Sequence, residues 1–508
     1  MKYPRRSGLL LHPTSLPGRF GIGDLGDAAY RFLDFLAASG QSYWQVPPLS
    51  PTGYADSPYQ GLAAFAGNPM LISPEKLAQS GYLSEADLDA ARLSAFPDDR
   101  VDFGPVIRYK TGLLDRAFAN FRARATDDQR AGFAHFCAEQ ALWLDDFALF
   151  MALKEANQLC PWHEWELQVA RREPEALAHW RKSLADSVEN QKWRQWQFFV
   201  QWLAVKRYAN ARGIRIIGDI PIFVSADSAD VWVNRPLFHF DSDLKPIVVA
   251  GVPPDYFSET GQLWGNPLYN WKVMAQDRYA WWIARFRMAF MQADVVRIDH
   301  FRGFYNYWEI PAGEKTAIHG QWVHGPGADL FRAVTAALGD VAIIAEDLGD
   351  FDAQSRAGVD ALQSEFGYPG MKVLQFAFDG GPTDPFLPHN FARDCVVYTG
   401  THDNDTTVGW YQVTSTEMER ERAHTYLGRH PLKAPDMASD LIRLAWASVA
   451  NTAITTVQDL LGLGHEARMN TPSTVGPPNW CWRLLPGALT DEVAARLLEL
   501  TSIYGRKP

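Results

Sequence analysis

Acidic side chains end several short apolar segments of this sequence. Four such segments can be read along the chain, namely residues 215–219 ending in Asp219, 294–299 ending in Asp299, 341–347 ending in Glu346 and Asp347, and 395–403 ending in His402 and Asp403. A carboxylate beside a buried strand is costly unless it is paired or used. Any one of them, Asp347 and Asp219 in particular, could instead cap the helix that follows. Four coinciding ends are hard to explain by capping alone.

Paired carboxylates at one site indicate glycosyl transfer. One carboxylate attacks the anomeric carbon, while a second, kept protonated, gives its proton to the leaving oxygen. A retaining enzyme needs the two carboxyl groups about 5–5.5 Å apart, which neighbouring strand ends can provide. Arg297 stands two residues before Asp299, so on a strand both side chains point to the same face. Its charge is expected to keep Asp299 ionised, as a nucleophile requires.

The elements that must position these side chains are short strands alternating with helices. Eight apolar runs predict strands, at residues 8–11, 42–46, 214–219, 294–299, 341–347, 371–376, 395–398 and 453–457. Nearly continuous apolar runs are typical of strands buried on both faces of a parallel sheet. Helical periodicity at 27–39, 328–338 and 440–450 lies between some of them. The pattern predicts an α/β fold, a (β/α)8 TIM barrel with large insertions, whose strand ends meet at one mouth.

The spacing of these strands is uneven. We expect a single catalytic barrel domain over residues 1–508, with a mainly helical insertion at about 50–210. Helical patterns at 133–156 and 190–212 support that insertion. A second insertion, at about 221–271, is rich in Pro, Asp, Asn and aromatic residues and is interpreted as long ordered loops above the mouth.

Composition excludes several classes of function. The chain has 508 residues, 47% of them hydrophobic, and a net charge of −11. It is therefore globular, and it lacks the basic stripe that nucleic acid requires. No apolar run approaches the ~18 residues of a membrane span, and the apolar run after Arg5 and Arg6 is too short for a secretory signal. The four widely spaced cysteines indicate reduced thiols and a cytoplasmic protein. The 19 tryptophans are a weak pointer to carbohydrate.

A glycine-rich motif at residues 21–26 matches the G-x-G-x-x-G pattern of dinucleotide sites. The long loop before it and the missing acidic residue after the next strand argue against that function. We interpret it as a turn capped by Asp24 or Asp27. No organic cofactor is expected, and no dense Asp/Asn loop predicts a metal site.

Longer motifs carry a family resemblance. Residues 218–221, 297–303, 345–349 and 400–404 follow the order of the signature regions of the α-amylase superfamily. The amino-acid sequences of these segments resemble those of the amylomaltases, the 4-α-glucanotransferases of glycoside hydrolase family 77. Further matching segments are 11–17, 56–60, 251–257, 262–267 and 468–472. The resemblance extends from about residue 8 to residue 484.

The resemblance implies a role for individual residues. Asp299 is expected to be the nucleophile, Glu346 the general acid/base and Asp403 a third carboxylate that holds sugar hydroxyls, which leaves Asp347 as a helix cap. The implied substrate-binding residues are Tyr59 stacking on the donor glucose, Asp219 as a support of the site, Asp255, Tyr256, Phe257, Gln262 and Trp264 covering the acceptor side, Arg297 orienting Asp299, His300 and His402 bonding sugar hydroxyls, and Asn470.

The implied reaction moves a segment of an α-1,4-glucan to a new 4-position through a covalent glycosyl-enzyme. The donor would be a malto-oligosaccharide or starch-like glucan, and the acceptor glucose or another glucan. A hydrolase of the same superfamily shares the intermediate and remains the alternative. A non-catalytic glucan-binding barrel is the third possibility, against which the intact set of Asp299, Glu346 and Asp403 argues.

Overall fold

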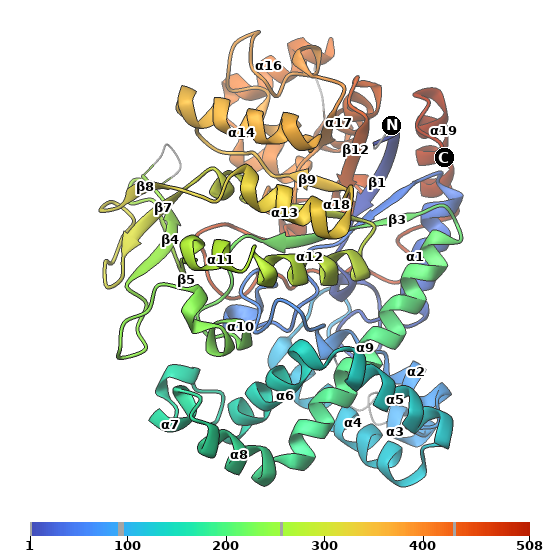
Figure 1. The fold of residues 1–508 in the computed structure, drawn as a ribbon. Coiled ribbons are helices and arrows are strands. Elements are labelled where there is room, and N and C mark those ends of the chain that lie inside the picture. The colour runs from blue at the N-terminus through green and yellow to red at the C-terminus, as the bar shows by residue number, and fades with distance from the viewer. Residues whose placement is uncertain (1–2, 90–95, 255–257, 430–432) are drawn as a thin grey trace.

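The fold is built around eight parallel strands. The computed structural model describes residues 3–89, 96–254, 258–429 and 433–508. The strands run in the spatial order β10-β11-β12-β1-β2-β3-β6-β9. Figure 1 labels β1, β3, β9 and β12 among them. Their bounds are β1 Arg6–Leu10, β2 Tyr43–Gln45, β3 Arg215–Pro221, β6 Val295–Asp299, β9 Ile343–Ala345, β10 Gly370–Val373, β11 Cys395–Tyr398 and β12 Thr452–Thr456. The amide of Ala345, in β9, donates at 2.9 Å to the backbone oxygen of Pro369, which precedes β10. This bond joins the two strands that stand at the ends of the order, β9 and β10.

The strands enclose a buried interior to which every one of them contributes. These inward side chains are Leu10, Tyr43, Ile217, Val295, Ile344, Met371, Val396 and Ile454. All eight predicted strands are present, so the predicted barrel is confirmed. The segments at 341–347 and 371–376 are longer than the strands they contain, because Glu346 and Asp347 follow β9 and residues 374–376 turn into a short 3-10 helix.

Helices lie between the strands. Those of the barrel are α1 Asp27–Ala38, α12 Ala280–Gln292, α13 Ala328–Leu338, α14 Ala353–Phe366, α16 Glu417–Leu427, α17 Ala434–Ala447 and α19 Asp491–Ile503. Shorter helices are α10 Ala229–Val233, α11 Trp271–Gln276, α15 Thr407–Gly409 and α18 Val457–Leu460. The predictions at 27–39 and 328–338 agree closely with α1 and α13. The helix predicted at 440–450 begins six residues earlier, at Ala434, and ends at Ala447.

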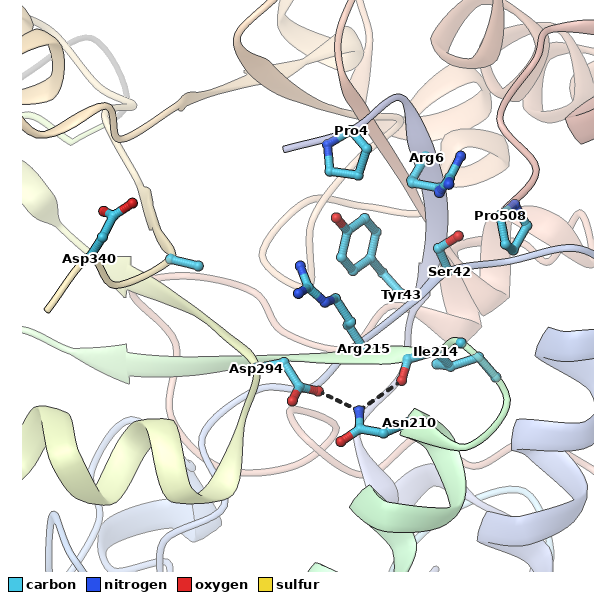
Figure 2. Close-up of a pocket in the computed structure, with 12 residues that line it drawn as sticks. Pro4, Arg6, Ser42, Tyr43, Asn210, Ile214, Arg215, Asp294, Asp340 and Pro508 are labelled. Atoms are coloured by element: carbon cyan, nitrogen blue, oxygen red, sulfur yellow. Dashed lines mark hydrogen bonds between the residues drawn. The ribbon is translucent and has the colours of Figure 1, made fainter. Parts of the chain in front are cut away.

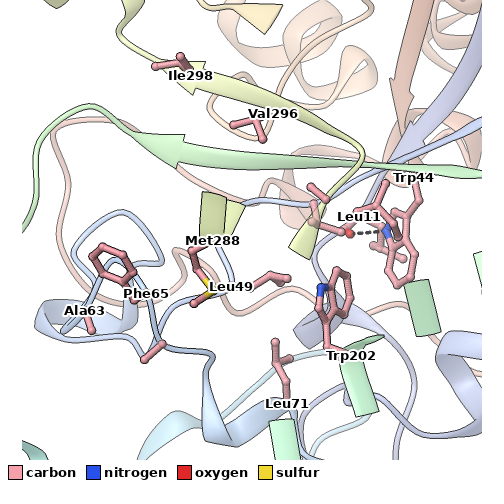
Figure 3. Close-up of a cluster of buried hydrophobic side chains, with 14 of the residues drawn as sticks. Leu11, Trp44, Leu49, Ala63, Phe65, Leu71, Trp202, Met288, Val296 and Ile298 are labelled. Carbon is pink, nitrogen blue, oxygen red and sulfur yellow. Dashed lines mark hydrogen bonds between the residues drawn. The ribbon is translucent and has the colours of Figure 1, made fainter. Parts of the chain in front are cut away.

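Between β2 and β3 the chain is mainly helical. The helices are α2 Pro74–Gln79, α3 Glu85–Asp89, α4 Phe103–Arg124, α5 Asp127–Glu139, α6 Ala141–Ala156, α7 Leu167–Ala170, α8 Pro174–Ser183 and α9 Ala185–Asn210. The pattern at 133–156 is divided between α5 and α6 at Gln140, whose ψ of 8° departs from helical geometry. Trp202 of α9 packs on Trp44 of β2, with ring centroids 6.1 Å apart, in a continuous buried cluster (Figure 3).

The interpretation of residues 221–271 as loops was wrong in one respect. Strands β4 (Val248–Val252) and β5 (Gln262–Pro267) join β7 (Asn306–Pro311) and β8 (Gln321–His324) in a four-stranded antiparallel sheet. The register of β4 and β5 shifts between Val249 and Gly251. That irregularity breaks the two-residue alternation by which such strands are recognised, and β7 lies far along the chain.

Other predictions concern single features. At the glycine-rich turn, Asp24 Oδ1 accepts from the amide of Gly26 at 2.9 Å, whereas α1 begins after Gly26 without a side-chain cap. The four cysteines are free thiols. Among the described residues, no helix combines the length and the apolar character needed to traverse a lipid bilayer.

Candidate active site

The acidic residues converge at the carboxyl ends of the strands. Asp219 shares the inward face of β3 with Ile217, and Asp299 shares that of β6 with Val295. Ile298 pairs with Ala345, the last residue of β9, and the amide of Glu346 donates to the backbone oxygen of Ile298 at 3.1 Å. Asp299 at the end of β6 therefore lies beside Glu346, which follows β9. The usual spacing of neighbouring strands, about 4.8 Å, is compatible with the carboxyl separation of about 5–5.5 Å in a retaining pair.

Arg297 holds two of these carboxylates from within the barrel. Its Nη1 lies 2.6 Å from Asp219 Oδ2, and its Nη2 lies 3.0 Å from Asp299 Oδ1. Asp219 Oδ2 also accepts from the hydroxyl of Tyr59, at 2.8 Å. Asp219 is therefore a strand residue that orients Arg297 and Tyr59, and its capping alternative was wrong.

Burial sets the protonation of Asp299. It raises the pKa of this carboxyl to about 6, although the guanidinium of Arg297 acts in the opposite direction. The nearby carboxylates of Asp219 and Asp403 raise it further. The expected effect of Arg297 is present, but desolvation outweighs it.

Glu346 is held by two backbone amides. Its Oε2 accepts from the amide of His300 at 2.7 Å, and its Oε1 accepts from the amide of Leu348 at 2.8 Å. Burial and the neighbouring charge of Asp299 raise the pKa of Glu346 to about 7. His300 adopts a left-handed conformation, with φ 52°, in the turn that follows β6. A carboxyl group with this pKa can carry a proton near neutral pH and give it up.

The pKa of Asp403 is shifted in the opposite direction from those of Asp299 and Glu346. Asn470 Nδ2 donates to its Oδ1 at 2.6 Å, and His402 Nε2 lies 3.3 Å from its Oδ2. Burial opposes ionisation, but His402 and the hydrogen bond from Asn470 outweigh it and hold the pKa of Asp403 well below its usual range. The site thus combines one permanently ionised carboxylate with two that titrate near neutrality.

Two buried histidines present unpaired ring nitrogens. His300 Nε2 and His402 Nδ1 make no hydrogen bond with the described residues, whereas His402 Nε2 faces Asp403. Trp264 of β5 meets His300 edge to face, with centroids 4.9 Å apart, and its Nε1 donates to Gln262 Oε1 at 3.1 Å. Buried polar atoms rarely remain without a partner, so these nitrogens indicate a polar ligand.

Two further predictions have a different outcome. Asp347 does not cap a helix; its Oδ1 accepts from the amide of Met371 at 2.8 Å, and its Oδ2 lies 2.9 Å from Arg356 Nη2. Asp352 caps α14 instead. The predicted binding residues Asp255, Tyr256 and Phe257 lie outside the described residues.

Sequence reasoning missed two residues at the site. Arg468 Nη2 donates to the backbone oxygen of Asp403 at 2.8 Å, although Arg468 had entered only as part of a motif. The indole of Trp480 packs against both Tyr59 and His402. The one available signal was a tryptophan in a Pro-rich stretch a few residues after the 468–472 motif.

A cavity among the described residues lies away from these carboxylates. It measures about 810 Å³ and is lined at the amino-terminal ends of the strands by Arg6, Tyr43, Arg215 and Asp294, with Asn210 bonded to Asp294 (Figure 2). That end of a barrel serves stability rather than catalysis. Within the described part of the chain, no three His, Cys, Asp or Glu side chains are grouped to hold a metal ion.

The fold is a (β/α)8 barrel, and two carboxyl groups lie at the ends of adjacent strands. Asp299 is held by Arg297, and the pKa of Glu346 is near neutrality. This combination defines a glycoside-processing enzyme of the paired-carboxylate class. Comparison with known proteins places it further. The chain belongs to the 4-alpha-glucanotransferase family, glycoside hydrolase family 77, whose family model matches residues 11–489.

Full-length relatives agree with this assignment. The chain is 51% identical to the 4-alpha-glucanotransferase of Thermus thermophilus over 98% of both chains. It is 50% identical to that of Synechocystis sp., covering 99% of this chain and 98% of the relative. The amylomaltase of Streptococcus agalactiae, solved in complex with acarbose, superposes with a TM-score of 0.94 at 40% identity, covering 99% of this chain and all of the other.

Proposed function

We propose that this 4-α-glucanotransferase (EC 2.4.1.25) works by a double displacement in which Asp299 is the nucleophile and Glu346 the general acid/base. The donor is an α-1,4-glucan such as a malto-oligosaccharide, and the acceptor is glucose or another glucan. The observation that supports the proposal is that Asp299, the last residue of β6, lies beside Glu346, which directly follows the adjacent strand β9.

In the first half-reaction a carboxylate oxygen of Asp299 bonds to the anomeric carbon as the glycosidic C–O bond breaks. The proton of Glu346 passes to the leaving oxygen, so the shortened glucan departs as an alcohol. Arg297 orients Asp299 through the 3.0 Å contact. Because the pKa of Glu346 is raised to about 7, its carboxyl group can carry the proton that it donates at neutral pH.

In the second half-reaction Glu346, now a carboxylate, takes the proton from the 4-hydroxyl of the acceptor. The acceptor oxygen then displaces Asp299 from the anomeric carbon, and the configuration is retained. Asp403 stays ionised throughout and, with the unpaired nitrogens of His300 and His402, binds sugar hydroxyls. Tyr59 offers a ring face to the donor sugar, and Asn470 fixes Asp403.

The free cysteines support a cytoplasmic location.

Maltotriose as the sole substrate tests the proposed reaction. Transfer gives glucose and a ladder of longer maltodextrins with little net gain of reducing ends, because each cleavage is matched by a new bond. Chromatography of the products and a reducing-sugar assay are run together. A steady rise of reducing ends without a ladder would assign the protein to hydrolysis instead.

A further inference from the structure

Trp480 is the centre of an aromatic cluster beside the carboxylates. Its ring centroid lies 5.7 Å from that of Tyr59 and 5.7 Å from that of His402. Tyr59 and His402 themselves stack at 5.1 Å, with an interplanar angle of 18°. The three rings therefore form a closed triangle, and Trp480 is only 6% exposed.

The orientation of the His402 ring depends on this triangle. The imidazole is buried, and its Nδ1 makes no hydrogen bond with the described residues. Its nearest charged neighbour is Asp403, 3.3 Å from Nε2. One contact through Nε2 does not fix the plane of the ring, so that plane is set by the surfaces that pack on it, and here those include Tyr59 and Trp480.

The same triangle restrains Tyr59. The hydroxyl of Tyr59 donates to Asp219 Oδ2, to which Arg297 also donates. Arg297 in turn bonds Asp299. Trp480 thus contacts one side chain linked to Asp299 and another that faces Asp403.

The backbone around Trp480 is held in an unfavourable conformation. Its φ is +64°, in the left-handed region that bulky side chains avoid. The amide of Trp480 donates to the backbone oxygen of Met469 at 2.7 Å. Asn470, which follows Met469 in the chain, donates through its amide to the backbone oxygen of His402 at 3.1 Å. Strain that is retained by surrounding bonds tends to occur where a side chain must be placed accurately for function.

We propose that Trp480 is a positioning residue of the transfer reaction, fixing the rings of Tyr59 and His402 for the transition state without contacting the sugar. The inference rests on the proposed function. Because a loosely held His402 still binds sugar but adopts the productive direction less often, the loss should fall on kcat rather than on KM.

The test compares Trp480→Leu and Trp480→Phe with the wild-type protein in maltotriose disproportionation. Trp480→Leu removes the aromatic surface, and its kcat should fall at least tenfold while KM changes less than threefold. Trp480→Phe keeps a flat ring at the same backbone angle and should restore kcat to within about threefold of wild type. A Trp480→Leu protein with unchanged kcat, or one whose KM alone rises, would overturn the proposal.

A matched control separates positioning from stability. Trp196 of α9 forms a similar triangle with Phe121 and Phe133, at 5.7 Å from each, far from the carboxylates. Trp196→Leu should lower the melting temperature with kcat unchanged; an equal loss of kcat in both leucine variants contradicts the proposal. If Trp480→Leu does not fold, Trp480→Met takes its place under the same criteria. An inactive wild-type protein would refute the proposed function itself.

Discussion

Arg297 Nη2 lies 3.0 Å from Asp299 Oδ1, and the two residues stand two positions apart on the inward face of β6. Arg297 is buried and Asp299 is half-buried, so water screens their interaction only in part. The same guanidinium reaches Asp219 at 2.6 Å. One cation therefore stabilises two carboxylates at the mouth of the barrel, and its removal should affect both stability and ionisation.

Arg297→Met should lower the free energy of unfolding by about 3–5 kcal/mol, because it leaves the buried carboxylate of Asp219 and the half-buried carboxylate of Asp299 without their cationic partner. Arg297→Lys should cost less, since an ammonium keeps the charge but cannot bond both carboxylates in a planar fork. Urea denaturation measures the difference. The control is Arg332→Lys, on the exposed face of α13, which should change little. Equal stability of Arg297→Met and wild type would show that the ion pairs contribute nothing net.

Asp299→Asn should abolish turnover while the fold is retained, because the amide keeps the volume but cannot attack the anomeric carbon. We expect a loss of on the order of 10⁴-fold or more in kcat, equivalent to several kcal/mol of barrier. Transfer from maltotriose and the melting temperature are measured together. Asp329→Asn, an exposed change on α13, serves as control. Near-normal transfer by a folded Asp299→Asn protein would remove Asp299 from the role.

Glu346→Gln should block protonation of the leaving oxygen. A glycosyl fluoride needs little protonation, so the variant should still form the glycosyl-enzyme with this donor. The intermediate should then accumulate, because the acceptor lacks a base. Mass spectrometry of the digested protein locates the sugar, which is expected on Asp299. A sugar attached to Glu346 in the wild-type protein would reverse the two assignments.

The pH dependence of kcat/KM follows from the same two groups. In the proposed mechanism the active form has Asp299 ionised and Glu346 protonated. Since burial raises their pKa values to about 6 and about 7, activity should rise as pH increases through 6 and fall as it increases beyond 7. Rates with maltotriose from pH 4 to 9 test this bell shape. The alkaline limb should be absent from the glycosylation of Glu346→Gln by a glycosyl fluoride; its persistence would assign that limb to another group.

Trp264→Ala should raise the fraction of hydrolysis. Trp264 packs on His300 and presents its indole near the acid/base, where an acceptor sugar could stack through dispersion and burial. Water needs no such platform, so the loss should fall mainly on transfer. The amount of new reducing ends divided by the amount of longer maltodextrins measures how the enzyme divides between hydrolysis and transfer. Trp322→Ala, on strand β8 of the same sheet, is the control. A stable Trp264→Ala protein with an unchanged ratio would place acceptor binding elsewhere.

The sequence by itself determined the barrel and the acidic residues of its mouth. Strands buried on both faces must be nearly continuous apolar runs, so residues 294–299 and 395–398 stood out, and a carboxylate at such a run's end has few structural explanations. The two-residue spacing of Arg297 and Asp299 placed both on one face of a strand, because side chains alternate there. Such local regularities need no knowledge of distant partners.

Tertiary structure alone decided what depends on distant partners. The pKa of Asp299 rises because burial outweighs Arg297, and the degree of burial is set by the whole barrel. Asp347 accepts from the amide of Met371 on the next strand rather than from the first amides of α14, and along the chain these two arrangements look alike. Trp480 reaches His402 from an irregular loop, which has no periodicity to reveal where its side chain points.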